Sequence, residues 1–193
     1  MSTKTLIGLW IAIAFIVGAV AILTSGPQTF PDTQSLIRFQ RAADDYAFMH
    51  RRIERRLAPL AVTADAETIR RAVDAMAAAI RVAREGAHEG DLLDPAVQRV
   101  FRARIATVLR DHGLTAADLS PEDVDVTTAS LTINGEMPWR LTDATPPCVL
   151  EVLPALPPEL EYRFVGGDLV LVDVHASLIV DILRHAASAA DTF

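Results

Sequence analysis

The sequence predicts an α+β protein with an N-terminal transmembrane helix, then a three-helix unit, then a small antiparallel β unit. Three observations predict this class. A long apolar run opens the chain of 193 residues, apolar residues recur at helical spacing over residues 32–113, and β-branched residues with Asn-Gly and Gly-Gly turns follow over residues 127–193. Roughly 165 residues remain beyond the run, which is enough for one medium domain or two small ones.

The opening run, TLIGLWIAIAFIVGAVAIL, covers residues 5–23 and contains no charged side chain. As a helix it extends ~28 Å at about 1.5 Å per residue, close to the thickness of the bilayer's hydrocarbon core. The best small-x-small cleavage match, Ala19-Val20-Ala21, lies inside the run. We therefore expect residues 1–24 to be an uncleaved anchor, with a cleaved signal peptide as the alternative.

Charges beside the run predict its orientation. Lys4 and the terminal amine precede it, and the first cation after it is Arg38. The positive-inside rule then predicts a single-pass protein with a cytoplasmic N-terminus and its bulk in the periplasm or otherwise outside the cytoplasm. Two prolines make residues 25–31 an extended stalk.

Three amphipathic helices are expected in residues 32–113, joined by short loops as a small bundle. The first follows Asp32 as N-cap, the second follows Asp65, and the third begins at Asp94-Pro95 and ends at Gly113. The first helix runs to about Leu57, and its apolar face comprises Leu36, Phe39, Ala43, Tyr46, His50, Ile53, Leu57 and Leu60.

Turn motifs and apolar runs predict the elements of the β unit. Asn134-Gly135 predicts a hairpin, and CVLEVLP reads as an apolar strand that buries Cys148, the only cysteine. Strands are expected at 161–165, 168–173 and 178–183, with the first two joined by Gly166-Gly167. The stretch 178–187 also has helical spacing, so a helix there is the alternative.

The segment LPALPPELEYRFVGGDLVLVDVHASLIVDIL, Leu153–Leu183, resembles a C-terminal module of exported bacterial proteins of unknown function. The shared features are a proline-rich entry, Tyr-Arg, Val-Gly and a Leu-Val-Leu-Val-Asp strand. This resemblance implies an envelope location and no known activity. The segment is also faintly similar to periplasmic metal-homeostasis proteins, although the histidine-rich region expected beside it is missing.

A basic stretch, MHRRIERRL, places His50, Arg51, Arg52, Arg55 and Arg56 within nine residues. Residues 32–112 carry 14 Arg against 12 acidic residues, whereas residues 113–193 carry 3 against 13. The basic residues are therefore candidates for contact with anionic lipid or with the acidic half of the chain. Nucleic acid is not expected as a partner, because the chain carries a net charge of −7 and the stretch lacks interleaved aromatics.

Histidines offer a second interpretation, a periplasmic metal or ligand sensor that uses His50, Glu54 and His88. We expect His50 to be a hydrogen-bonded core residue, because it lies on the apolar face. The Glu85-x-x-His88 pair occurs once and Gly86 interrupts it, and His175 lies in a turn without spaced partners. No cofactor or metal is therefore expected.

Motifs for nucleophiles, phosphate loops, dinucleotides and zinc pairs are absent from the sequence. We therefore expect a membrane-anchored envelope protein that is not an enzyme but an interaction or scaffolding domain. Its expected partners are the bilayer and a second envelope protein, held along a strand edge or in a helix groove.

Overall fold

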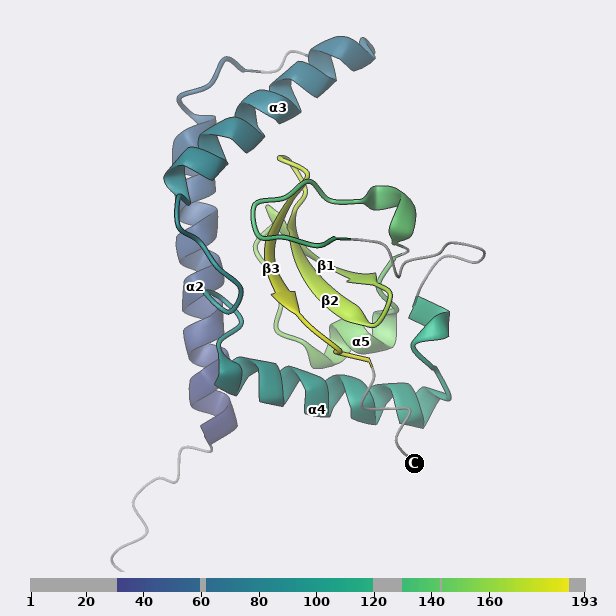
Figure 1. The fold of residues 1–193 in the computed structure, drawn as a ribbon. Coiled ribbons are helices and arrows are strands. Elements are labelled where there is room, and N and C mark those ends of the chain that lie inside the picture. The colour runs from purple at the N-terminus through teal and green to yellow at the C-terminus, as the bar shows by residue number, and fades with distance from the viewer. Residues whose placement is uncertain (1–30, 60–61, 120–129, 143, 188–193) are drawn as a thin grey trace, which may run out of the picture. The chain divides into compact units, whose positions relative to one another are not determined.

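A computed structural model describes residues 31–59, 62–119, 130–142 and 144–187 (Figure 1). Residues Asp32–Phe193 form one compact unit, distinct from Met1–Pro31. The expected anchor at residues 1–24 and nearly all of the stalk lie outside the described residues. Within the described part of the chain, no helix is both long enough and apolar enough to span a bilayer.

Three long helices follow one another in the first half of the unit. α2 spans Pro31–Glu54, α3 spans Ala66–Ala83 and α4 spans Pro95–His112. The expected cap Asp32 lies instead in the first turn of α2, where its negative charge favours the helix dipole. α2 also ends three residues before Leu57, the expected end.

The expected caps of α3 and α4 are confirmed. Asp65 accepts a hydrogen bond from the Thr68 amide, and Asp94 accepts from the amides of Ala96 and Val97. Gly113 ends α4 with φ +66°, in the left-handed region that glycine adopts without strain. Local sequence therefore sets the ends of these two helices.

The sheet is an antiparallel meander of three strands in the order β1-β2-β3, with bounds Leu160–Val165, Asp168–Asp173 and Leu178–Leu183. All three expected strands are confirmed, and the helical alternative for 178–187 is wrong. The register shifts between Leu171 and Val172, which pair with Asp181 and Ile179. This irregularity lets Val180 and Leu183 face one side of the sheet while Ile179 and Ile182 face the other.

Two expectations for the β unit are corrected. CVLEVLP is not a strand, because Pro147–Val152 forms a short helix, α5, with proline in its first turn. Cys148 lies on that helix and is half-buried rather than buried. Asn134-Gly135 does form a turn, with Asn134 at φ +60°, but the residues beside it form no strand ladder with one another in the described stretch 130–142.

Both faces of the sheet are buried. The helix-facing core combines α2, α4, α5 and the sheet, and its large, fully buried members include Phe39, Leu93, Phe101, Ile105, Leu109, Phe164, Leu169 and Leu171. The opposite face is covered by the segment 130–142 through Leu131, Met137 and their neighbours. A third cluster joins the end of α2 to α3 and to the β2–β3 turn through Ile53, Met76, Ile80, Ala176 and Leu178. The helices thus share their core with the sheet.

The segment 130–142 also lies along β3. The amide of Asn134 donates to the Ile179 carbonyl, and the amide of Met137 donates to the Ser177 carbonyl. The Trp139 indole then donates to the Ser177 hydroxyl, while the Arg163 guanidinium lies 5.7 Å from the centre of the Trp139 ring. These contacts hold the segment against the β2–β3 turn.

Candidate functional site

A buried carboxylate, Asp173, lies at the end of β2 and binds the inner face of α2. The Tyr46 hydroxyl donates to its Oδ2 over 2.8 Å, and His50 Nδ1 lies 2.6 Å from the same oxygen. The side chains of His50 and Asp173 are both fully buried. Because His50 lies on the apolar face of α2, the helix directs its ring into the core, as the sequence predicts.

The second oxygen of Asp173 holds the β2–β3 turn. Oδ1 accepts from the amides of His175 and Ala176 over 3.0 and 2.8 Å. An ionised carboxylate only accepts hydrogen bonds, so Nδ1 of His50 carries a proton and donates a hydrogen bond to Asp173. The lone pair of His50 Nε2 is then left free to face the opposite way.

His175 lies on that opposite side. Its Nδ1 is 3.2 Å from His50 Nε2, and the two ring centres are 5.2 Å apart. The Glu54 carboxylate, one helical turn after His50, completes a group whose three ligand atoms all lie within 4.8 Å of one another. His50 is buried, whereas Glu54 and His175 are exposed, so the group is open on one side.

Electrostatics around Asp173 favour the neutral form of its tyrosine partner. Burial raises the pKa of Tyr46 far above its usual value, and the charge of Asp173 and the hydrogen bond to it act in the same direction. Arg84 opposes them, since its guanidinium lies 5.3 Å from the centre of the Tyr46 ring. Tyr46 therefore acts as a fixed hydrogen-bond donor to Asp173.

The sequence-based sensor set, His50, Glu54 and His88, is brought together only in part. His88 lies elsewhere, with Nδ1 2.6 Å from Asp91 and most of its side chain exposed. The structure places His175 in the third position. The sequence does not predict the contact of His175 with His50, because the two residues are 125 positions apart in the chain.

The four arginines of the basic stretch do not share the buried position of His50. Arg51 donates to Glu159 over 2.8 Å, while Arg52, Arg55 and Arg56 are exposed. His50 is fully buried and so does not belong to their surface. The basic stretch therefore divides into an inner histidine and an outer cationic face.

This outer face continues along α2. At about 100° per residue, seven positions lie within roughly 40° of one line, and all are exposed. We call them the outer stripe of α2, although the last member lies one residue past the end of the helix: Gln34, Ile37, Arg41, Asp44, Phe48, Arg52 and Arg55. Phe48 and Ile37 are large apolar residues that remain exposed, with 60% and 55% of their surface accessible to solvent. Among the described residues, no side-chain partner is found for Arg41, Arg52 or Arg55.

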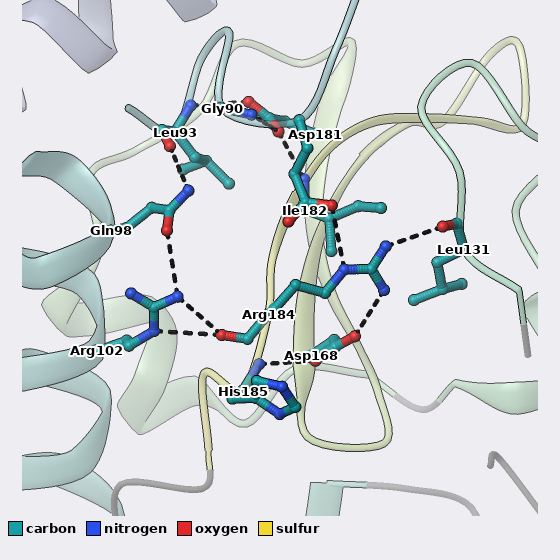
Figure 2. Close-up of polar contacts among 11 residues, drawn as sticks. Gly90, Leu93, Gln98, Arg102, Leu131, Asp168, Asp181, Ile182, Arg184 and His185 are labelled. Carbon is teal, nitrogen blue, oxygen red and sulfur yellow. Dashed lines mark hydrogen bonds and ion pairs between the residues drawn. The ribbon is translucent and has the colours of Figure 1, made fainter. Parts of the chain in front are cut away.

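A second polar network ties the loop before α4 to the sheet (Figure 2). Asp181 of β3 accepts hydrogen bonds from the amides of Gly90, Leu92, Leu93 and Ile182. Arg184 contacts Asp168, Glu89 and the Leu131 carbonyl, and its own carbonyl accepts from Arg102. Every group in this network has a protein partner, so its role is structural.

An apolar groove of about 490 Å³ lies between the start of α2, α4 and the end of α5. Leu36, Ile37, Val152, Leu153 and Pro154 line it, together with Arg104 and Glu151. Arg104 donates to the Val152 carbonyl over 2.8 Å, so its guanidinium is held by the wall of the groove. The groove contains none of the residues around Asp173.

The fold and the site define an α+β domain with a meander sheet, a helix layer and a buried His–Asp pair. No family profile and no curated protein matches the sequence. Among solved structures, the C-terminal domain of the inner membrane protein CigR from Salmonella enterica is similar, with 21% identity and a TM-score of 0.37. The similarity covers 48% of this chain and 88% of that domain.

Proposed function

We propose that the chain is a membrane-anchored envelope protein whose folded part is a non-catalytic interaction module that lies on anionic lipid through the outer stripe of α2. One observation supports this function best. The stripe combines exposed apolar side chains with arginines that have no partner among the described residues. Interfacial helices have this composition.

The arginines are available to lipid phosphates because no side chain among the described residues pairs with them. The stripe contains three arginines, Arg41, Arg52 and Arg55, and a single acid, Asp44. The Asp44 carboxylate accepts a hydrogen bond from the Gln40 amide. Each cation near an anionic bilayer surface contributes about 1 kcal/mol. Phe48 and Ile37 lie on the same line and add apolar contact at the boundary between headgroups and acyl chains.

The stripe is also a better contact surface than the edges of the sheet. Isolated bridges meet both edge strands, with Ala144 opposite Arg163 on β1 and Glu136 opposite Leu178 on β3. A partner strand would have to displace these segments before it could pair. The outer stripe needs no such rearrangement.

Vesicle sedimentation tests the proposal. Residues 31–193, which hold the compact unit, are mixed with vesicles of phosphatidylglycerol and phosphatidylcholine, or of phosphatidylcholine alone. We expect binding to the anionic vesicles that falls with salt, because exposed charges are screened. The double variant Arg52→Glu/Arg55→Glu should bind at least about tenfold more weakly, given about 1 kcal/mol per cation.

The matched control reverses two exposed arginines of α4, Arg99→Glu and Arg110→Glu, so that the net charge changes by the same amount. We expect the control to keep most of its binding. Equal loss in both variants would mean that binding follows net charge alone, and would contradict a role for the stripe. Equal binding to neutral and anionic vesicles would contradict the proposal as well.

A further inference from the structure

We propose a divalent transition-metal site whose ligands are His50 Nε2, His175 Nδ1 and a Glu54 carboxylate oxygen. The site goes beyond the membrane-contact function and does not depend on it, because its ligands are not members of the outer stripe. His50 comes from the inner face of α2, Glu54 from the last turn of the same helix, and His175 from the β2–β3 turn.

The geometry matches a metal site closely. The two imidazole nitrogens are 3.2 Å apart, and all three ligand atoms lie within 4.8 Å of one another. Tetrahedral ligands at about 2.0–2.1 Å from zinc are about 3.3–3.4 Å from each other. The two nitrogens therefore need almost no movement, and the glutamate needs only a rotamer adjustment on an exposed side chain.

The partners of His50 orient it for coordination. A histidine ligand usually donates its other ring proton to a carboxylate, which fixes the tautomer and raises the basicity of the binding nitrogen. Asp173 supplies that carboxylate at 2.6 Å, and Tyr46 and the amides of His175 and Ala176 hold it in place. His50 Nε2 thus presents its lone pair on a rigid support.

His175 completes the site by a change of tautomer. With His50 protonated at Nδ1 alone, the 3.2 Å contact in the absence of metal is a hydrogen bond from His175 Nδ1–H to His50 Nε2. When a metal binds, the His175 proton moves from Nδ1 to Nε2 by exchange with water, which reaches this exposed ring. The imidazole stays neutral, so the step releases no proton and the metal takes the place of the hydrogen bond between the rings.

Ligand chemistry selects the class of metal. Two imidazoles and one carboxylate suit zinc, nickel, cobalt or copper, whereas calcium and magnesium prefer oxygen ligands alone. Glu54 and His175 are exposed, which leaves a fourth position open to water. His88 and Asp91 form a separate surface pair that has no third ligand group among the described residues, so they are a suitable comparison.

Calorimetric titration tests the site. The full-length chain in detergent is titrated with zinc chloride and, in a separate experiment, with nickel chloride. Both titrations use a buffer without chelators. We expect one metal per chain and a rise in the melting temperature, because a metal that binds only the folded state stabilises it. Magnesium at the same concentration should produce neither effect.

Variants at the exposed ligands keep the test independent of folding. His175→Ala and Glu54→Gln remove ligands that are not part of the core, and each should weaken zinc binding by more than about tenfold, since even outer partners of a ligand cost 10–100-fold. His88→Ala should bind zinc as the wild type does, and circular dichroism should match for all variants. A wild type that binds no zinc, or ligand variants that bind as tightly as the wild type, would overturn the proposal.

Discussion

Asp173 connects three parts of the chain through one carboxylate. It receives the Tyr46 hydroxyl and the His50 ring from α2, and the amides of His175 and Ala176 from the turn after β2. A buried charge is tolerated only when hydrogen bonds replace its lost hydration. The four donors satisfy this requirement, so the site is fixed to the core at this residue.

Tyr46 gives the domain a predicted sensitivity to alkaline pH. Its folded pKa is raised above the unfolded value of about 10, so its contribution to stability is complete below pH ~10 and is lost as pH rises beyond that value. We expect the wild type to lose stability between pH 9 and 11 in urea unfolding, and Tyr46→Phe to lose less. At pH 7 the variant should be less stable by about 1.5–3 kcal/mol, because a hydrogen bond to a charged group is lost.

Tyr162→Phe is the control for this measurement. Burial raises the pKa of Tyr162 too, so Tyr162 also contributes to the loss of stability at alkaline pH. Part of that loss should therefore remain in Tyr46→Phe, and part should disappear in Tyr162→Phe. Its hydroxyl donates to the Pro154 carbonyl and does not touch Asp173. Parallel curves for the wild type and Tyr46→Phe from pH 9 to 11 would show that Tyr46 does not contribute.

At the level of elements, Asp94 is expected to stabilise α4 as its N-cap. Partial burial acts to raise the Asp94 pKa, but hydrogen bonds from the Val97 and Ala96 amides and from Arg38 lower it overall. The contribution is therefore present above the unfolded pKa of about 4 and is lost as pH falls through the folded value. Asp94→Ala should lower the free energy of unfolding by about 1 kcal/mol at pH 7 and by less at pH 3, as measured by urea unfolding.

Asp94→Ser separates capping from charge, since serine caps a helix without being ionised. This variant should keep most of its stability at pH 7 and show a weaker dependence on acid pH than the wild type. If Asp94→Ala were as stable as the wild type at pH 7, the cap would have no energetic role.

Elements specified by local chemistry were predictable from the sequence. The three strands follow from apolar runs between Gly-Gly and polar turns, and α3 and α4 follow from their aspartate caps. α5 was missed because six residues are too few for propensity to decide, and packing of Val149 in the core holds this turn of helix. Asn134-Gly135 does not close a hairpin, because Asn134 and Gly135 themselves hydrogen-bond to Ile179 of β3.

At the scale of the molecule, two of the three proposed metal ligands could be predicted from the sequence. His50 and Glu54 are one turn apart on a recognisable helix, so sequence periodicity brings them together. Asp173 and His175 are 123 and 125 residues away from His50, and only the packing of β2 against α2 makes them neighbours. The one local hint was a pair of polar residues, Asp173 and His175, directly after an apolar strand.

The placement of the whole chain is tested by a topology fusion. Alkaline phosphatase joined to the C-terminus should be active if residues 5–23 insert with the N-terminus in the cytoplasm, because the enzyme requires export. A fusion that lacks residues 1–24 should be inactive, and a fluorescent protein that folds only in the cytoplasm should give the opposite pattern. Activity in the truncated fusion, or inactivity in the complete one, would reject the predicted anchor.

The contact between Trp139 and Ser177 gives the protein a built-in optical probe. The chain has two tryptophans, and Trp10 lies in the opening run, so residues 31–193 carry Trp139 as the single indole. Its ring nitrogen donates a hydrogen bond to the hydroxyl of Ser177, which lies two residues after His175. Events at the β2–β3 turn can therefore be followed in real time by fluorescence, without attaching a dye.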